Sequence, residues 1–542
     1  MSSCTIDADL ISQLPDHIIH QILSFLPTKD VVRLSVLSKE WYGFFTYFPI
    51  FDFSNSYFGI DYQDYFIKVD RTLEFVKFVY TSLLRQSLHS RNVPKFELSL
   101  TRKSKYISCT TPQLKHKLTV LINRCIRLGT QYGVKELALE FPYDNYYYRL
   151  PKAIFFSAKQ LVVCKLAYCS IDAPTINLPS LRELSLKVVY LCDQRIIHNL
   201  VFTCPFIEKF TIAHCSGLDY LTLSGFTKLK KVKVRGRSPN KIEVDALSLQ
   251  NFFFSVFGED TEINIIACKN LEVLKIKNSS LTVGAIQDLI SKFSALKVLV
   301  LDFDKVWDLD ANEFESIKIS NQRLEKLKLC SDTMVETIID APRLKSLKYL
   351  LGKIPSLFSA STASLLEVDI VLLRHCRLLE LNKFLKNFNQ VELVNLYIPY
   401  HISCGFPEIV SNISSSIINH LELNINLNNV GDHAKVEAAE EALVNGLFWA
   451  SHPKSLLIGS GWDTNNEFMK FLCKKLVLRE KEQLCCAASK VKCWLHELKG
   501  VNIEHCRRNG ERKVLACDVL LDSLENLAPL ALDEKIYFVF QW

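Results

Sequence analysis

The sequence has little glycine and little proline, 17 of each in 542 residues. It therefore leaves no room for a long disordered tract rich in these two residues. No stretch comes near the roughly 20 consecutive apolar residues that cross a bilayer as a helix. The first ten residues, MSSCTIDADL, lack the basic start and the apolar core of a secretory signal. We therefore expect an intracellular protein, in the nucleus or the cytoplasm, with no membrane partner.

Metal-binding pairs of the Cys-x-x-Cys type are also missing, although the chain contains 18 cysteines. In a chain without a secretory signal, cysteines are more often small buried hydrophobic residues than partners in disulfides. The densest group of possible ligands consists of Cys473, Cys485, Cys486, Cys493, His496, His505 and Cys506. Its adjacent pair, Cys485 and Cys486, is poorly placed to bind one ion jointly. The sequence thus predicts no metal site.

Motifs for phosphate binding, cofactor binding and thiol catalysis are absent as well. The Gly-Ser-Gly stretch at residues 459–461 lacks the third glycine of a dinucleotide fingerprint and a helix start in register. Adjacent His and Cys residues, such as His214 and Cys215, point to opposite faces if they lie on a strand. The net charge of +7 is modest for this length and includes no dense run of Lys and Arg. We therefore expect neither an enzyme, nor a cofactor, nor a nucleic-acid partner.

The composition is that of a folded protein, because 49% of the residues are hydrophobic and 23% are charged. A chain of this length exceeds a single hydrophobic core. It must therefore form several domains or an array of repeats.

Helical periodicity is clear in the first fifty residues. Ile18, Ile22 and Leu26 recur every four residues, which predicts an amphipathic helix. After a break at Pro27, Thr28 is an N-cap candidate for a second helix, and a third helix follows. Three helices of this size bury little surface, so we expect part of their apolar surface to contact a partner.

The segment from Leu14 to Trp41, LPDHIIHQILSFLPTKDVVRLSVLSKEW, resembles an F-box, the adaptor-binding module of SCF ubiquitin ligases. The resemblance implies that this segment docks on a Skp-type adaptor, within a complex built on a cullin scaffold. The implied adaptor-binding residues are Leu14, Pro15, Ile18, Ile22, Leu26, Val32, Leu37 and Trp41. Glu40 departs from the family, which often has a basic residue before the Trp. The alternative is that these residues form the ordinary core of a small helical cap.

A second pattern recurs through most of the remaining chain: an apolar residue, two others, a second apolar residue, one other, and a third apolar residue. Its first positions are Val134, Leu161, Leu181, Ile207, Leu229, Leu249, Leu271, Leu296, Leu324, Leu344, Leu365, Val391 and Ile418. Successive first positions are 20 to 28 residues apart, as in leucine-rich repeats. Each unit supplies one short strand and a returning helix or loop, and must stack on its neighbours to bury its apolar face. The pattern predicts a curved solenoid.

The segments before the repeats are less regular. Residues 51–66, rich in aromatic residues and Asp, read as an irregular linker. Helical spacing predicts helices over Leu73–Leu84 and Leu114–Leu128, the second closed by Gly129. Alternation predicts a strand over Lys95–Leu100.

After His452 the repeat pattern ends. We predict a strand in HPKSLLIGS, a helix over Asn466–Glu482, a strand over Trp494–Ile503 and a last helix over Val514–Leu527. The closing IYFVFQW alternates too irregularly to be assigned.

Together these parts resemble plant F-box proteins with leucine-rich repeats and a C-terminal FBD-type region; TCPFIEKFTIAHCSGL and LPSLRELSL are similar to their repeat units. The predicted fold is α/β: a three-helix F-box over 8–48, a linker and N-terminal cap over 49–130, a curved leucine-rich-repeat solenoid over 131–430, and an α+β FBD-like cap over 431–542. The resemblance implies a non-catalytic subunit of an SCF-type ubiquitin ligase that holds an unknown target protein for ubiquitination. The alternative is a scaffold that binds or sequesters a partner without directing its degradation.

The residue between the second and third apolar positions of each repeat points away from the core, to the face where solenoids usually bind partners. Five lysines occupy this position, and two more cations lie two places further along their strands. The candidate target-binding residues are Lys165, Lys233, Arg235, Lys275, Lys277, Lys328 and Lys348. They are expected to attract an acidic or phosphorylated segment. The alternative is an ordinary solvated strand face.

Overall fold

The computed structural model divides into two compact units, Met1–Leu271 and Glu272–Trp542, which are described separately. The residues described are 14–26, 28–46, 50–54, 69–89, 94–100, 112–131, 133–141, 148–173, 175–237, 239–257, 261–277, 283–302, 314–331, 334–361, 363–372, 378–399, 420–426, 444, 448, 452–458, 463–481, 494–506, 511–526 and 535–542. No helix within these ranges combines the length and the apolarity that crossing a bilayer requires.

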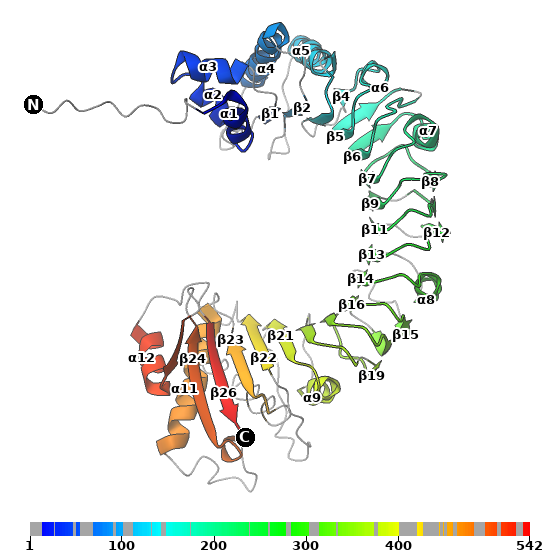
Figure 1. Ribbon diagram of the computed structural model, residues 1–542. Coiled ribbons are helices and arrows are strands. Elements are labelled where there is room, and N and C mark those ends of the chain that lie inside the picture. Colours follow the sequence, from blue (N-terminus) through cyan, green and yellow to red (C-terminus); the bar gives the residue numbers. More distant parts are fainter. Residues whose placement is uncertain are drawn as a thin grey trace, which may run out of the picture. The chain divides into compact units, whose positions relative to one another are not determined.

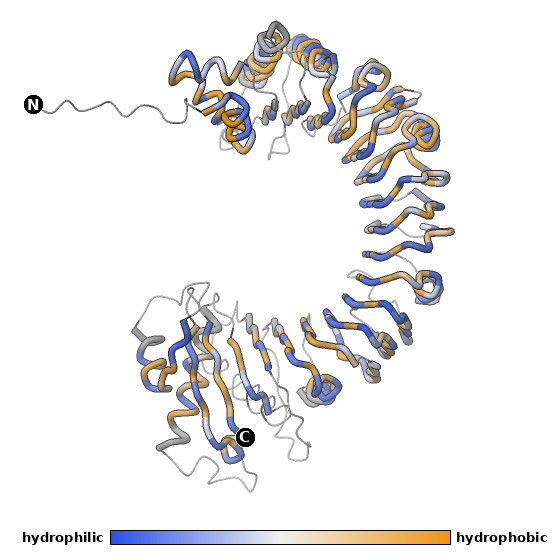
Figure 2. Tube along the Cα trace, in the orientation of Figure 1, coloured by the Kyte–Doolittle hydropathy of each residue, from blue (hydrophilic) through white to orange (hydrophobic). Residues whose placement is uncertain are grey.

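The first unit begins with three short helices, α1 (Asp16–Leu23), α2 (Thr28–Leu34) and α3 (Lys39–Thr46). The carbonyl of Pro15 accepts the first hydrogen bonds of α1, at 2.8 Å from the amide nitrogen of Ile18 and 3.2 Å from that of Ile19. Each helix carries hydrophobic stretches next to hydrophilic ones (Figure 2). The hydrophobic residues meet in one small core made of Ile19, Leu23, Val31 and Trp41.

A buried hydroxyl connects these helices to the first strand, β1 (Ile50–Ser54). Thr28 is buried in the first turn of α2, and its Oγ1 accepts a hydrogen bond of 2.9 Å from the backbone N–H of Asp52. The expectation that residues 51–66 form an irregular linker is therefore wrong for Phe51–Ser54, and residues 55–68 lie outside the described part. β1 is parallel to β2 (Lys95–Ser99), and β2 is parallel to β3 (Glu136–Glu140). The helices α4 (Val69–His89) and α5 (Pro112–Gln131) pack against each other beside them.

The parallel ladder continues along the first unit, with each strand in register with the next (Figure 1). Its further members are β5 (Val163–Ile171), β6 (Glu183–Leu191), β7 (Lys209–Ala213), β9 (Lys231–Arg237) and β11 (Asn251–Phe257), and the short β4 (Tyr148–Arg149) pairs with β5. The second apolar positions of the repeats lie opposite one another at Leu137, Cys164, Leu184, Phe210, Val232 and Phe252. All of them are fully buried. Stacked units thus share one continuous apolar column.

The second unit repeats this arrangement. Its parallel strands are β13 (Val273–Lys277), β14 (Val298–Asp302), β16 (Lys326–Ser331), β18 (Ser346–Leu351), β20 (Glu367–Leu372), β21 (Leu393–Pro399), β22 (His420–Asn426) and β23 (Ser455–Ile458). The aligned and buried second positions are Leu274, Leu299, Leu327, Leu347, Val368, Val394 and Leu421.

The returning segments of the repeats are more varied than the sequence predicts. Some are helices, namely α6 (Ile154–Ser157), α7 (Arg195–Thr203), α8 (Val283–Lys292) and α9 (Leu378–Leu385), which the short 3-10 helix η2 (Lys386–Phe388) extends. Others are strands in two further parallel sheets, β8 (Tyr220–Ser224) with β10 (Lys241–Asp245) and β12 (Glu262–Ile266), and β15 (Phe314–Ser320) with β17 (Met334–Asp340) and β19 (Leu357–Ser361). In β8 and β10 every second residue is buried, as in a half-buried strand. The expectation of a helix or loop is wrong at these units.

At its C-terminal end the second unit becomes antiparallel. β23 pairs with β26 (Lys535–Gln541), β26 with β24 (Gly500–Cys506), and β24 with β25 (Arg512–Leu515), while α11 (Asp463–Lys481) packs on α12 (Cys517–Asn526). The closing segment, which the sequence left unassigned, therefore lies between two strands. The predicted strand over Trp494–Ile503 is a 3-10 helix, η3 (Trp494–His496), followed by β24. The last helix was predicted to begin at Val514, but it begins at Cys517 because residues 512–515 are in β25.

Gly129 does not end α5, as the sequence suggested, because the helix continues to Gln131. A Cβ placed on Gly129 would lie 2.6 Å from Cδ1 of Phe96, a fully buried residue of β2. The glycine thus allows the helix to approach the ladder closely.

We expect Gly129→Ala to destabilise the first unit by about 1 to 3 kcal/mol, because the added methyl group overpacks the Phe96 ring. Gly284→Ala in α8 is the matched control, since no atom other than those of its chain neighbours and its own helix backbone lies within 4 Å of its Cβ position. There, helix propensity alone should stabilise by about 1 kcal/mol. Urea unfolding of both variants measures the two changes, and a stabilising Gly129→Ala would contradict the close packing.

Ile207→Asp tests the repeat register. Ile207 is fully buried between successive units, so an unpaired carboxylate there should lower the free energy of unfolding by about 3 kcal/mol or more. Thr211→Asp, on the outward face of β7, should change it by about 0.5 kcal/mol or less. Equal unfolding midpoints in urea for the two variants would show that Ile207 is not a core position.

Candidate functional site

The three N-terminal helices expose an unusual amount of apolar surface. Among the residues predicted to contact an adaptor, Leu14, Ile22, Leu26 and Leu37 are exposed large hydrophobic residues. Pro15 is also exposed, and Ile18 and Val32 are half-buried. Large hydrophobic side chains concentrated on so small a module are typical of a protein-binding surface.

Trp41 differs from the other predicted contact residues because it is 9% exposed. Its indole ring belongs to the core with Ile19, Leu23 and Val31, and the ring of Phe44 meets it edge-on at 5.7 Å. Its backbone N–H donates a 3.2 Å hydrogen bond to Oγ of Ser38. In the free chain, Trp41 therefore supports the apolar surface from within.

Two residues that the sequence analysis did not select belong to the same exposed set. Phe25 is 81% exposed and Val36 is 83% exposed. Val36 lies just beyond the end of α2, at Leu34. Phe25 lies after the end of α1, at Leu23, and so falls outside the helical stripe. Their signal in the sequence is an apolar residue placed next to a helix end, where no internal partner is available.

Trp41→Ala should destabilise the helical module by about 3 to 5 kcal/mol, because it leaves a cavity in a core of few residues. Leu37→Ala, at a position 67% exposed, should change stability by about 0.5 kcal/mol or less. Hydrogen exchange of residues 14–46 measures both changes. Unchanged protection in Trp41→Ala would place the indole outside the core.

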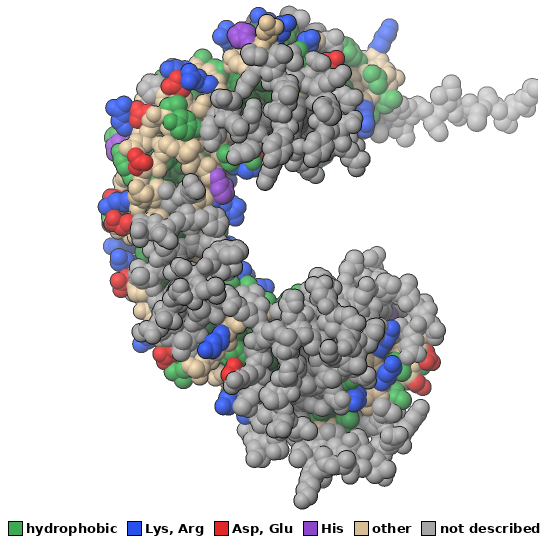
Figure 3. Space-filling model, turned by 180° about the vertical axis from the view of Figure 1, so that it is seen from behind, with side chains coloured by type: hydrophobic (Ala, Val, Ile, Leu, Met, Phe, Trp, Pro, Cys, Tyr) green, Lys and Arg blue, Asp and Glu red, His purple; other side chains and the backbone are tan. Residues whose placement is uncertain are grey.

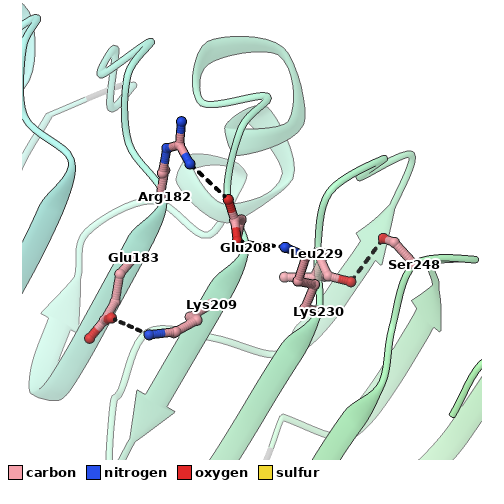
Figure 4. Close-up of polar contacts among 7 residues, drawn as sticks. All are labelled: Arg182, Glu183, Glu208, Lys209, Leu229, Lys230 and Ser248. Carbon is pink, nitrogen blue, oxygen red and sulfur yellow. Dashed lines mark hydrogen bonds and ion pairs between the residues drawn. The ribbon is translucent and has the colours of Figure 1, made fainter.

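Ion pairs are frequent in the first unit, both on the outward face of its strands and at the residues just before them. Arg182 and Lys230 both bind Glu208, at 3.2 Å and 2.9 Å, and Lys209 binds Glu183 at 3.3 Å (Figure 4). Lys165, a candidate target-binding residue, also binds Glu183, at 3.5 Å. Lys and Arg side chains lie beside Asp and Glu on the face shown in Figure 3. The hydrogen bond from Lys230 is the main cause that lowers the pKa of Glu208. Most of these cations are therefore already neutralised.

β9 is different. Lys231, Lys233 and Arg235 alternate along this strand on its outward side, and within the described residues none of them forms an ion pair with Asp or Glu. Nζ of Lys233 lies 5.5 Å from the ring centre of Phe253 on β11, and the guanidinium carbon of Arg235 lies 4.9 Å from it. Desolvation, followed by the positive charges of Arg235 and Lys231, lowers the pKa of Lys233. Three cations thus share one small area without a counter-charge.

The remaining candidates lie in the second unit. Lys277 pairs with Asp302 at 3.4 Å and Lys348 pairs with Asp369 at 3.1 Å. Lys275 and Lys328 form no ion pair in the described part of the chain. The register places Val300 between them, since it aligns with Lys275 on one side and with Lys328 on the other. The structure therefore brings Lys233 and Arg235 together in the first unit and separates the candidates of the second.

The buried cysteines of the described ranges do not carry activated thiols. Burial is the main cause that raises the pKa of Cys125 and of Cys164, each to about 12. Buried thiols of this kind are poor nucleophiles at neutral pH. Across the described ranges, no group of three or more His, Cys, Asp and Glu residues is placed to hold a metal ion.

Models of known protein families match two segments of the chain. Residues 11–53 match the model of the F-box domain. Residues 122–276 match the model described as FBD-associated F-box protein At5g56370, LRR repeats. The chain carries an F-box and leucine-rich repeats of the FBD-associated type. The resemblance to plant F-box proteins with leucine-rich repeats is therefore confirmed.

Similar proteins from Arabidopsis thaliana are all named as F-box proteins, two of them with leucine-rich repeats. Putative F-box/LRR-repeat protein At4g15060 is 27% identical over 64% of this chain and 80% of its own length. Putative F-box/FBD/LRR-repeat protein At4g26350 is 29% identical over 38% of this chain, and FBD-associated F-box protein At5g27750 is 30% identical over 49%. These two matches cover 42% and 58% of the relatives' lengths, less than two thirds in each case.

Proposed function

We propose that the chain is the substrate-recognition subunit of an SCF-type ubiquitin ligase. The F-box binds a Skp-type adaptor that connects it to a cullin scaffold, and the repeats bind a target protein. The observation that carries the proposal is the set of exposed apolar residues on the F-box helices, which includes Ile22, Phe25, Val36 and Leu37. Such a subunit acts by holding the target near the ubiquitin-transferring enzyme, and forms no bond itself.

The connection between the F-box and the repeats supports this role. Thr28 of α2 is hydrogen-bonded to Asp52 of β1, and α3 packs against α4. Because β1 is in register with β2 and β3, these contacts support an adaptor-binding surface that is held next to the first repeats. A receptor needs this rigidity, because proximity accelerates transfer only when the reacting groups are held in place.

The proposed domain organisation separates adaptor binding from target binding. An F-box over 8–48 precedes a linker and N-terminal cap over 49–130, a curved solenoid over 131–430 and an FBD-like α+β cap over 431–542. The parallel register of the strands supports stacked repeats, and the antiparallel pairing of β23 with β26 supports a cap that closes the edge of the sheet. The protein is proposed to act in the nucleus or the cytoplasm, where SCF-type complexes assemble.

The double variant Ile22→Asp with Leu37→Asp tests adaptor binding. Both side chains are exposed, so the variant should fold, while two carboxylates in an apolar interface should weaken binding of a Skp-type adaptor at least about tenfold. The control, Phe202→Asp with Phe206→Asp, replaces two exposed aromatic residues of the repeat region. It should bind the adaptor as the unmodified protein does. Affinity capture followed by calorimetric titration measures both.

The same pair of variants separates a receptor from a scaffold. A partner that both forms capture, and that accumulates only in cells expressing the adaptor-blind form, is a ubiquitination target. A partner captured by both forms whose abundance never changes identifies a scaffold that sequesters it. Adaptor capture by the Ile22/Leu37 variant at the level of the control would refute the proposed interface.

A further inference from the structure

The cations of β9 differ from the outward lysines of β5, β6 and β7, which are ion-paired. Lys187 binds Glu140 at 3.7 Å, and Lys165 and Lys209 share Glu183. Among the described residues the neighbours of β9 offer it no acidic partner: Lys209, Thr211 and Ala213 of β7, and Asn251, Phe253 and Ser255 of β11, lie opposite its three cations. A row of three like charges raises the free energy of the free chain, and an external anion would lower it.

Phe253 gives this row a defined geometry. The side chains of Lys233 and Arg235 both extend over its ring, and this cation–π attraction favours one arrangement of each side chain. Ordering the two long side chains in advance reduces the conformational entropy that a ligand must remove on binding. The apolar ring beneath them also displaces water, which strengthens their attraction for an anion.

The spacing and the donor types indicate the form of the anion. Residues two apart on a strand lie about 6.6 Å from each other, and so do alternate side chains of an extended peptide laid along it. Two of the three cations are lysines, which act as point charges, and Arg235 alone offers the planar fork that favours phosphate. The backbone of β9 is already paired with β7 and β11, so it has few N–H groups to add. Single carboxylates at alternate positions fit this row better than a phosphate group.

We propose that Lys231, Lys233 and Arg235, ordered by the ring of Phe253, bind an extended segment of the target protein that carries Asp or Glu at alternate positions. This proposal rests on the proposed function only in calling the ligand a target; the binding of an acidic segment does not depend on the F-box. The site lies entirely within the first unit, on β9 and β11. The lysines of the second unit are not required for it.

The probe is a short fluorescent peptide with Glu at alternate positions, and its matched counterpart has Gln in place of each Glu. Fluorescence anisotropy with the full chain should show binding of the Glu peptide only. Binding should weaken as salt is raised, because exposed charges are screened. Equal affinity for the two peptides, or no binding of either, would overturn the proposal.

The triple variant Lys231→Gln, Lys233→Gln and Arg235→Gln should bind the Glu peptide about tenfold more weakly, since three exposed ion pairs contribute about 0.5 kcal/mol each. The control removes the same total charge at three residues that are already ion-paired: Lys187→Gln, Arg195→Gln and Lys241→Gln. Its affinity should remain within about twofold of the unmodified chain. An equal loss in both triple variants would show an effect of net charge and would refute a site on β9.

Phe253→Leu keeps an apolar residue but removes the aromatic face, and should weaken binding of the Glu peptide about threefold. Unaltered affinity in this variant would refute the ordering role of the ring. Tighter binding of a single-stranded RNA or of a phosphopeptide at the same row would refute the choice of carboxylate. No adaptor is present in the peptide assay, and the β9 variants should still capture adaptor, so a failure here is distinguishable from a failure of the proposed function.

Discussion

The in-register stacking of parallel strands is the constraint on which the rest of the structure depends. Each unit contributes residues such as Leu184 and Leu186 that are fully buried only because the next unit supplies Phe210 and Ile212 opposite them. One unit alone would expose both rows, so no repeat is stable without its neighbours. A shift of one residue in any strand would move its buried set to the outward face. The register is therefore fixed throughout each ladder by burial.

Once burial has fixed the register, the outward residues can vary at little cost to the fold. Exposed ion pairs such as that of Lys209 with Glu183 contribute about 0 to 1 kcal/mol each, much less than a buried leucine. The sheet can therefore balance its charges on β5, β6 and β7 and leave them unbalanced on β9. Stability comes from the inward face, while the outward face is available for binding. This separation explains how one scaffold can accept different partners through substitutions on one side of each strand.

The ladder could be predicted from the sequence because its signal is local and repeated. Buried positions such as Leu299 and Leu301 alternate with outward positions within one short strand, and the spacing to the next unit is regular. The returning strands were missed because they fall between the repeats that the spacing selects. β8 fits the apolar pattern at Leu218, Leu221 and Leu223, but it lies too close to the unit that begins at Leu229 to count as a repeat of its own. A segment such as KIEVD, in turn, pairs with residues some 20 positions away. β26 was missed for a related reason: its pairing with β24 joins residues 500 and 541. Gly129 was assigned to a helix end because its contact with Phe96 comes from another element.

The F-box shows the same limit on a smaller scale. Its periodicity predicts an apolar stripe on each helix. It cannot divide the apolar residues between the internal core and the exposed surface. Ile19, Leu23 and Val31 enclose Trp41, while Ile22 and Leu37, one to four positions away from core residues, remain exposed. With so few core residues, every apolar side chain turned outward reduces the stability of the free module. A partner that covers these side chains restores that stability, so adaptor binding and the folding of the F-box are expected to be coupled.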